Sequence, residues 1–135
     1  MSWMCQANGS GRWHATCFQK GMVVAMLRIP LPTSRHAEVI EVLRSVQGRV
    51  LSQPGCKAYH VYQEQFQDPA VVLIERWASK AALESHIRSE SYRRVLCAIE
   101  LAGGPPEVSF DVVSATEGME LIERLRDLGG ADQAL

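Results

Sequence analysis

The chain has 135 residues, of which 47% are apolar and 21% are charged, with 14 basic and 15 acidic side chains. This composition is typical of one globular domain and excludes a disordered or fibrous protein. Because the net charge is only -1 and the basic residues form no block, nucleic acid and an anionic membrane are poor candidate partners.

The cysteines and the hydropathy indicate where such a chain would reside. Cys5, Cys17, Cys56 and Cys97 form no CxxC pair, and the sequence shows no signal peptide, so we expect a reducing, cytoplasmic setting without disulfides. No apolar run approaches the roughly 20 residues that cross a bilayer. We therefore expect a protein that is soluble or at most peripheral.

Residues 1–21 match neither helical nor strand periodicity, and we expect an irregular N-terminal extension there. His14 and Cys17, spaced HxxC, with Cys5 upstream, are an alternative set of metal ligands. Three such residues without a fourth do not make a recognisable zinc pattern, so we predict no metal site.

The first predicted strand is MVVAMLRI, which starts at Met22 and is apolar on both alternating faces. Pro30 and Pro32 end it. Thr33 or Ser34 is a candidate cap for a helix that runs up to the sequence QPGC. Apolar residues at helical spacing in this segment are Val39, Leu43, Val46 and Val50.

A predicted hairpin follows. CKAYHVYQEQF forms its first strand, with Cys56, Ala58, His60 and Tyr62 on one face and Tyr59 and Val61 on the other. The sequence QDP supplies a turn, and AVVLIERWA forms the second strand of the hairpin.

Ser79 is a candidate N-cap for a second long helix. The apolar stripe expected on this helix consists of Leu83, His86, Ile87, Tyr92, Val95, Leu96 and Ile99. GGPP ends the helix and EVSFDVVSA forms a fourth strand. Thr116 can cap a last amphipathic helix carrying Leu121, Leu125 and Leu128, and residues 129–135 form a tail.

The order β-α-β-β-α-β, followed by a closing helix, predicts an α+β domain of the ferredoxin-like type over residues 22–128. Two helices cover one face of such a sheet. Since the predicted strands are apolar on both faces, something must cover the other face. We expect a second copy of the chain there, which makes the protein a homodimer.

The run PGCKAYHVYQEQFQDPAVVLIERWASKAALESHIRSESY carries motifs in a specific order. They are Pro54, Gly55 and Cys56, then Asp68 and Pro69, then Glu75 and Trp77, then Ala82, Leu83 and His86. In this order they resemble the antibiotic biosynthesis monooxygenase family of the dimeric α+β barrel superfamily, over about residues 22–128.

The resemblance implies a dimeric α+β barrel and a quinol monooxygenase-like reaction. In that reaction O2 oxidises a small aromatic quinol, phenol or anthrone without metal or flavin, so no cofactor is expected. The enzyme would supply an apolar pocket, a base and donors to negative oxygen. Since the superfamily has other members, a small-molecule isomerase, a hydrolytic enzyme and a non-catalytic dimeric ligand-binding module stay open.

Two positions depart from the members that oxidise polyphenols. Those members carry an asparagine four residues before the strand-ending tryptophan, where this chain has Leu73, and a tyrosine in the following helix, where it has Leu83. The first strand also lacks the asparagine that haem-degrading members use. Trp77 is retained, whereas most of the polar residues of those members are absent from this chain.

Glu75 and His86 are the predicted catalytic residues. Glu75 can serve as a base in an apolar cavity, or it can make a structural hydrogen bond or ion pair, for instance to Arg28 or to a residue of a partner chain. His86 suits proton transfer, with a satisfied core histidine as the alternative. Because a tight capped turn joins their elements, we expect the two side chains to converge, whereas Arg76 points away.

The remaining candidates are predicted to line a substrate pocket. They are Trp77, Leu73, Tyr62, His60 and Leu83. For Trp77, packing in the pocket wall or the dimer interface is favoured over a chemical role.

Overall fold

The computed structural model describes residues 21–126. Its elements in chain order are β1 (Val23–Pro30), the 3-10 helix η1 (Thr33–Arg35), α1 (His36–Arg44), α2 (Gln47–Leu51), β2 (Cys56–Glu64), β3 (Ala70–Trp77), α3 (Lys80–Ile87), α4 (Tyr92–Glu100), β4 (Glu107–Val112) and α5 (Met119–Arg126). Residues 21–113 form one compact unit, while α5 belongs to a second. None of the helices in this part of the chain has the length and apolarity that a bilayer crossing requires.

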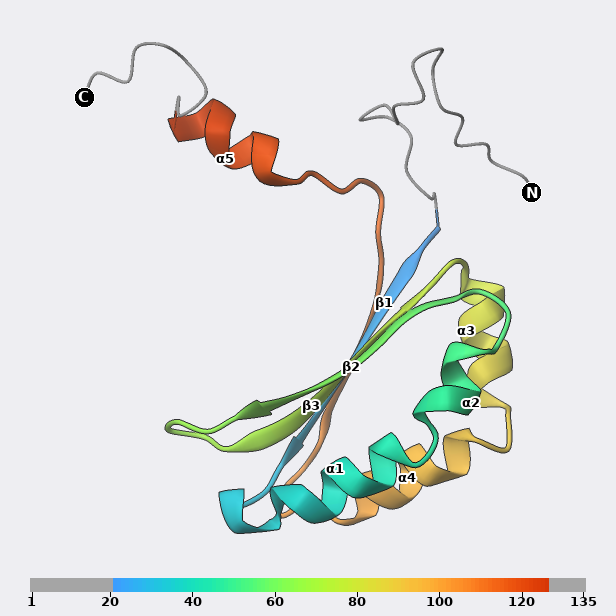
Figure 1. Cartoon of the computed structure of the whole chain (residues 1–135), viewed down its shortest axis with the longest axis vertical. Helices are drawn as coiled ribbons and strands as arrows, with labels where there is room; N and C mark the ends of the chain where they lie inside the picture. The colour runs from blue at the N-terminus through green and yellow to red at the C-terminus, as the bar shows by residue number, and fades with distance from the viewer. Residues whose placement is uncertain (1–20, 127–135) are drawn as a thin grey trace. The chain divides into compact units, whose positions relative to one another are not determined.

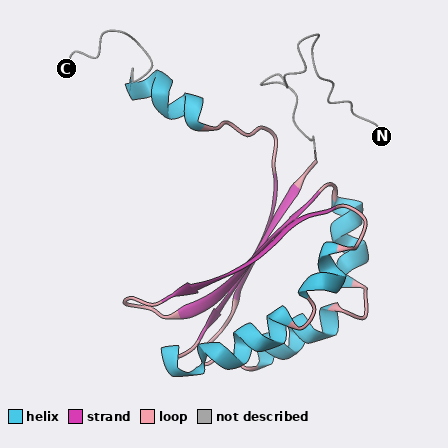
Figure 2. Ribbon diagram, in the orientation of Figure 1, coloured by secondary structure: helices cyan, strands magenta, loops and turns pink. Residues whose placement is uncertain are grey.

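The four strands form one antiparallel sheet in the order β2-β3-β1-β4. Helices α1 to α4 all lie over the same face of this sheet (Figures 1 and 2). The arrangement confirms the predicted ferredoxin-like α+β fold. The central strand β1 pairs with both β3 and β4, so that Leu27 lies opposite Leu73 on one side and Val108 on the other.

Alternation of side chains along the strands divides the sheet into a helix face and an open face. In β1 every second residue from Val23 to Ile29 is buried against the helices, and the residues between them are half-buried. The core between sheet and helices includes Leu27, Ile29, Val39, Leu43, Val46, Val50, Tyr59, Val71, Leu73, Trp77, Leu83 and Val95. All four apolar positions expected in the first helical segment are among them.

The first helical segment is interrupted, which corrects the prediction of one capped helix. Thr33 and Ser34 form the 3-10 turn η1 themselves, and no side chain caps either η1 or α1. Ser45 then ends α1, its hydroxyl donating a hydrogen bond to the Val42 carbonyl at 2.6 Å. A serine hydroxyl competes in this way with the helical backbone, so a new helix starts at Gln47.

The second helical segment is also divided. Ser79 caps α3 as predicted, since its Oγ accepts a hydrogen bond from the backbone N–H of Ala82 at 3.1 Å. The prediction of one continuous apolar stripe is wrong, because a break separates α3 from α4 and changes the helical phase. Ile87 and Leu96 are therefore 37% and 48% exposed, and Ala98 is buried in the core instead.

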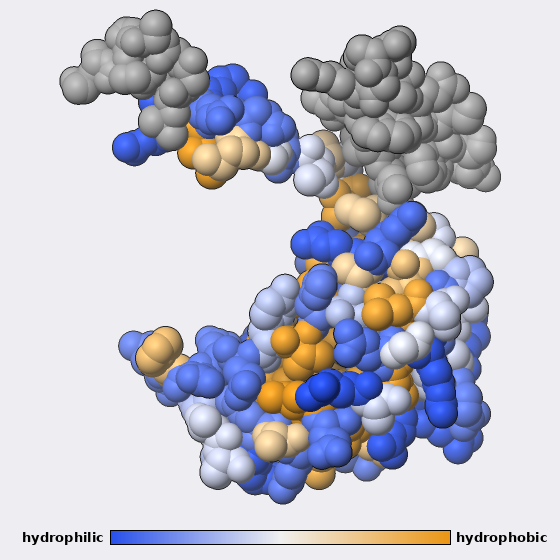
Figure 3. Space-filling model, in the orientation of Figure 1, coloured by the Kyte–Doolittle hydropathy of each residue, from blue (hydrophilic) through white to orange (hydrophobic). Residues whose placement is uncertain are grey.

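The open face of the sheet has no helix of the compact unit over it. Its apolar members Val24, Met26, Val72 and Ile74 are half-buried. At one end of this face Arg28 makes ion pairs with three carboxylates, those of Glu64, Asp68 and Glu107, at 2.8, 3.2 and 3.1 Å. Apolar surface is visible on the compact unit between the β2–β3 hairpin and the helices (Figure 3).

Gly55, in the turn before β2, holds the start of that strand against α3. Its φ of +87° lies in the left-handed region, and a Cβ added there would be 2.6 Å from the Cβ of Ala82. Its carbonyl accepts a hydrogen bond from the backbone N–H of Ala78 at 2.7 Å. Glycine is therefore required at this position by both conformation and space.

We predict that Gly55→Ala lowers the free energy of unfolding by about 1 to 3 kcal/mol, because it adds left-handed strain and a steric clash. Urea denaturation measures this change. Gly48→Ala is the matched control, since a Cβ there meets nothing within 4 Å. The control should be neutral or stabilising by about 0.5 to 1 kcal/mol. Equal stability of both variants would contradict the structural role of Gly55.

Candidate active site

Glu75 is a carboxylate on the helix face of the sheet, where it is only 3% exposed. A buried carboxylate is costly unless donors surround it. Two nitrogen atoms lie at hydrogen-bond distance from its oxygens. The indole N–H of Trp77 donates to Glu75 Oε1 at 3.1 Å, and Nε2 of His86 lies 3.0 Å from Oε2. Both carboxyl oxygens therefore have a partner inside the core.

His86 comes from α3, and its ring is fixed on all sides. It stacks on Trp77 with 4.5 Å between centroids, and Tyr92 meets it edge-on at 5.1 Å. Its second nitrogen, Nδ1, lies 2.9 Å from Oε1 of Gln53. The structure thus places His86 in contact with Glu75, while a catalytic role for either side chain stays a prediction.

Arg28 is not the partner of Glu75. The structure therefore corrects the expectation that a structural ion pair could join these two residues. The two residues lie on opposite faces of the sheet, because Arg28 alternates with the buried residues of β1. Its guanidinium is occupied by the three carboxylates of the open face.

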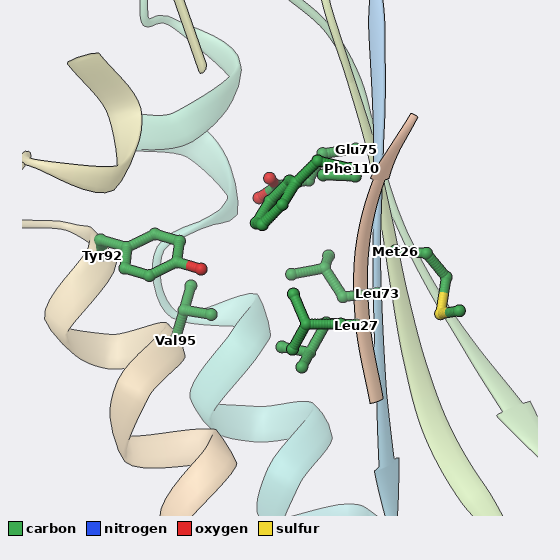
Figure 4. A pocket seen from close by; sticks show the side chains of 9 residues that line it. Met26, Leu27, Leu73, Glu75, Tyr92, Val95 and Phe110 are labelled. Carbon is green, nitrogen blue, oxygen red and sulfur yellow. The ribbon is translucent and has the colours of Figure 1, made fainter. Parts of the chain in front are cut away.

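A hollow beside Glu75 lies between the sheet and α4 (Figure 4). It is lined by Ala25, Met26, Leu27, Leu73, Glu75, Tyr92, Val95, Val108 and Phe110. The side chain of Met26 points away from the others, to the open face of the sheet (Figure 4). The whole empty volume of the hollow is about 260 Å³, but only about 10 Å³ admits the centre of a water molecule, which is room for about one water. Glu75 is the one carboxylate in this lining, and His86 lies behind it.

Tyr92 is a site residue that the sequence did not reveal. It begins α4, and its hydroxyl points across the hollow toward the sheet residues (Figure 4). Burial, and secondarily the charge of Glu75, raises the pKa of the Tyr92 hydroxyl. This group therefore stays an O–H donor at neutral pH. The signal available in the sequence was the position of Tyr92, an aromatic residue with a polar end, on the apolar stripe of its helix.

The other predicted pocket residues have different positions. Leu73 lines the hollow, whereas Trp77 and Leu83 are core residues that do not. His60 and Tyr62 lie on the open face, since they pair with Ile74 and Val72 of β3, and both are exposed. The structure does not bring them to Glu75.

The titratable neighbours of the Glu75–His86 pair are held neutral. Burial, followed by the charge of Glu75, raises the pKa of the Cys56 thiol and of the Tyr59 hydroxyl. Tyr59 also donates its hydrogen to the Leu43 carbonyl at 2.7 Å.

No group of three or more His, Cys, Asp or Glu side chains within residues 21–126 could hold a metal ion. The alternative ligands Cys5, His14 and Cys17 lie outside the described residues. The polar groups at and directly behind the hollow are a carboxylate, an imidazole and a phenol.

The fold of the chain is similar to several solved structures. A protein of Nitrosomonas europaea, provisionally described as an antibiotic biosynthesis monooxygenase, matches with a TM-score of 0.63 and 17% identity over 75% of this chain and 98% of its own. A protein of Caulobacter crescentus with the same provisional description matches at 0.61 and 20%, over 74% and 94%. A conserved protein of Methanosarcina mazei matches at 0.62 and 19%, over 70% and 94%.

In sequence, the chain is 23% identical to an uncharacterized protein of Synechocystis over 96 residues, which are 70% of this chain and 65% of that protein. The chain thus spans less than two thirds of this relative. The model of the family described as antibiotic biosynthesis monooxygenase matches residues 22–96, which is more than half of the chain. The chain therefore belongs to the antibiotic biosynthesis monooxygenase family.

Proposed function

We propose that this protein is a cofactor-independent monooxygenase that oxidises a small aromatic quinol, phenol or anthrone with O2. The observation that carries the proposal is the buried carboxylate of Glu75 in an otherwise apolar hollow, backed by His86 and faced by Tyr92. Family membership supports the reaction class, and the residues at the hollow supply a base and a donor.

The proposed chemistry begins with loss of an acidic proton from the substrate to the Glu75–His86 pair. The electron pair of the broken bond stays on the substrate, and the resulting anion donates electrons to O2. Overall the substrate gives up two hydrogens and four electrons. One oxygen atom is inserted as a carbonyl, and the other leaves as water.

The side chains have distinct roles in this scheme. Glu75 lines the hollow and touches the substrate, while His86 acts through Glu75 because it does not line the hollow. Trp77 orients the carboxylate by its hydrogen bond. Tyr92 donates its O–H to negative charge that develops on oxygen, a stabilisation that is strong in a water-poor site.

The dimensions of the hollow favour a small substrate. Val108 and Phe110 of the edge strand β4 line the hollow and are about half exposed. Because the space within admits only about one water, an aromatic ring would lie at the mouth of the hollow, beside these two residues, with its hydroxyl pointing toward Glu75 and Tyr92.

We also propose that the open face of the sheet pairs with the same face of a second copy. Its half-buried apolar side chains, including Val24, Met26 and Ile74, form a surface of a kind that is uncommon on monomeric proteins. An isologous pairing buries the same residues from both copies.

Glu75→Gln keeps the shape and an acceptor for Trp77 but removes the base, so we expect turnover to fall roughly 100-fold or more. His86→Ala should cause a comparable loss, because it removes the partner that receives the proton. An oxygen electrode with a panel of quinols, phenols and anthrones measures both, with circular dichroism to confirm folding.

Glu84→Gln, on the exposed side of α3, is the matched control and should keep full activity. Full activity of both site variants would contradict the mechanism. Conversion of a substrate without oxygen uptake would favour an isomerase instead. Ligand-induced thermal stabilisation without any turnover would favour a binding module.

Tyr92→Phe should lower kcat about 10-fold with little change in KM, because the lost hydroxyl stabilises charge that appears after substrate binding. Steady-state oxygen consumption measures the two constants. Tyr62→Phe on the open face is the control. A rise in KM alone would show that Tyr92 serves binding and not catalysis.

Ile74→Glu places a charge in the middle of the open face and should convert a dimer into monomers at micromolar concentration. Multi-angle light scattering measures the mass of each form. Leu51→Glu, at an exposed apolar position on the helical side, is the control and should remain dimeric. A monomeric wild-type protein at micromolar concentration would remove the basis for the proposed dimer.

A further inference from the structure

Gln53, between α2 and β2, contacts His86 on the ring nitrogen that faces away from Glu75. Its Oε1 lies 2.9 Å from Nδ1 of His86, and its Nε2 donates to Oγ of Ser89 at 3.3 Å. Gln53 does not line the hollow beside Glu75. Its contacts are those of a side chain that acts on the histidine and not on a ligand.

The hydrogen bonds around Ser89 favour one position for the hydrogen of the imidazole. A backbone carbonyl can only accept, so the Ser89 hydroxyl gives its single proton to the His86 carbonyl at 2.7 Å. The serine oxygen then accepts from the amide nitrogen of Gln53. This leaves the amide oxygen of Gln53 facing Nδ1 of His86, an arrangement that fits a hydrogen on Nδ1.

A hydrogen on Nδ1 has a direct consequence for the contact with Glu75. A neutral imidazole has one N–H, and beside a carboxylate a free ring would place it on Nε2. With that hydrogen held on Nδ1, the neutral ring directs a lone pair from Nε2 at the carboxylate. The 3.0 Å separation of Nε2 and Oε2 is a hydrogen-bond distance, so a further proton taken up by the pair has a place between these two atoms.

We propose that Gln53 is a positioning residue that keeps the ring hydrogen of His86 on Nδ1 and so makes the Glu75–His86 pair a stronger base. This inference rests on the proposed function. When the pair takes a proton from the substrate, the substrate bond breaks and its electron pair stays on the substrate. The proton forms the bond between Nε2 and Oε2, which replaces the repulsion between a lone pair and a carboxylate.

The groups around the pair allow this assignment. The other titratable side chains near it are Cys56 and Tyr59 from β2 and Tyr92 from α4, and burial keeps all three protonated by raising the pKa of each. Trp77 donates to Glu75 but does not titrate. The proton balance near the hollow is therefore set by Glu75, His86 and the acceptor on Gln53.

The direct test is the tautomer of His86 in the full-length protein, read from long-range proton–nitrogen NMR correlations between about pH 5 and pH 8. The neutral ring should carry its hydrogen on Nδ1 in the wild type and on Nε2 in Gln53→Met. Gln53→Glu keeps an oxygen acceptor and should restore Nδ1–H. A wild-type neutral ring protonated on Nε2, or an unchanged tautomer in Gln53→Met, would overturn the inference.

A ring protonated on both nitrogens over the whole range would also overturn it, because no lone pair would remain to accept a proton. Gln63→Met is the matched control. Gln63 makes the same contact to the second buried histidine, with its Oε1 3.0 Å from Nδ1 of His36. This control should leave both the tautomer of His86 and the turnover unchanged.

Activity gives a second readout that a merely structural role would not change. Gln53→Met should reduce turnover about 10-fold or more, and the limb of its pH profile that requires the unprotonated pair should move to lower pH. The limb moves to lower pH because a ring that is free to carry its hydrogen on Nε2 stabilises the unprotonated pair. Wild-type protein that carries Nδ1–H but consumes no oxygen with any substrate would overturn the proposed function and still support the hold of Gln53 on the ring.

Discussion

The contact between Glu75 and His86 is the constraint on which the compact unit depends most. Each side chain is inside the core, so each needs polar partners. Nε2 of His86 and Oε2 of Glu75 contact each other, while Gln53 and Trp77 contact the remaining ring nitrogen and carboxyl oxygen. This requires α3 to pass directly over the end of β3. The Ser79 cap fixes where α3 begins, and Gly55 permits the start of β2 to approach Ala82 on that helix.

Alternation along β3 places neighbouring residues in opposite environments. Glu75 faces a dry interior, where two nitrogen atoms hold its oxygens, whereas Arg76 faces solvent on the open side. In β1 the same alternation sends Leu27 to the hollow and Arg28 to a set of surface carboxylates. Glu75 and Arg28 thus have partners suited to their own faces, and these two networks share no residue.

Strand periodicity and cap chemistry were enough to predict the fold and half of the site. Spacing by two put Leu73, Glu75 and Trp77 on one face, and Ser79 indicated where the next helix starts. Because that helix follows β3 closely, its first inward polar residue, His86, was expected near Glu75. These are local relations, so a single sequence carries them.

The remaining site residues depend on relations that are not local. The pairing of β2 with β3 has a register shift between Cys56 and Ala58. In this register His60 lies opposite Ile74, on the open face of the sheet. Gln53 stands in a turn without periodicity, so no pattern marks its contact with His86. Tyr92 was expected on the inward stripe of its helix, but its place at the hollow depends on how α4 packs against the sheet.

The same contacts stabilise the core and orient the base, so stability and reactivity are coupled at this site. Removing one member of a buried ionic pair commonly costs about 3 to 5 kcal/mol, which is a large part of the stability of a small domain. Loss of activity in a truncated side chain would therefore not separate chemistry from unfolding. Replacements that keep the shape and one hydrogen bond, such as an amide for the carboxylate of Glu75, change the proton affinity with less disturbance. Turnover, measured together with the position of the ring hydrogen on His86, then distinguishes a structural pair from a catalytic one.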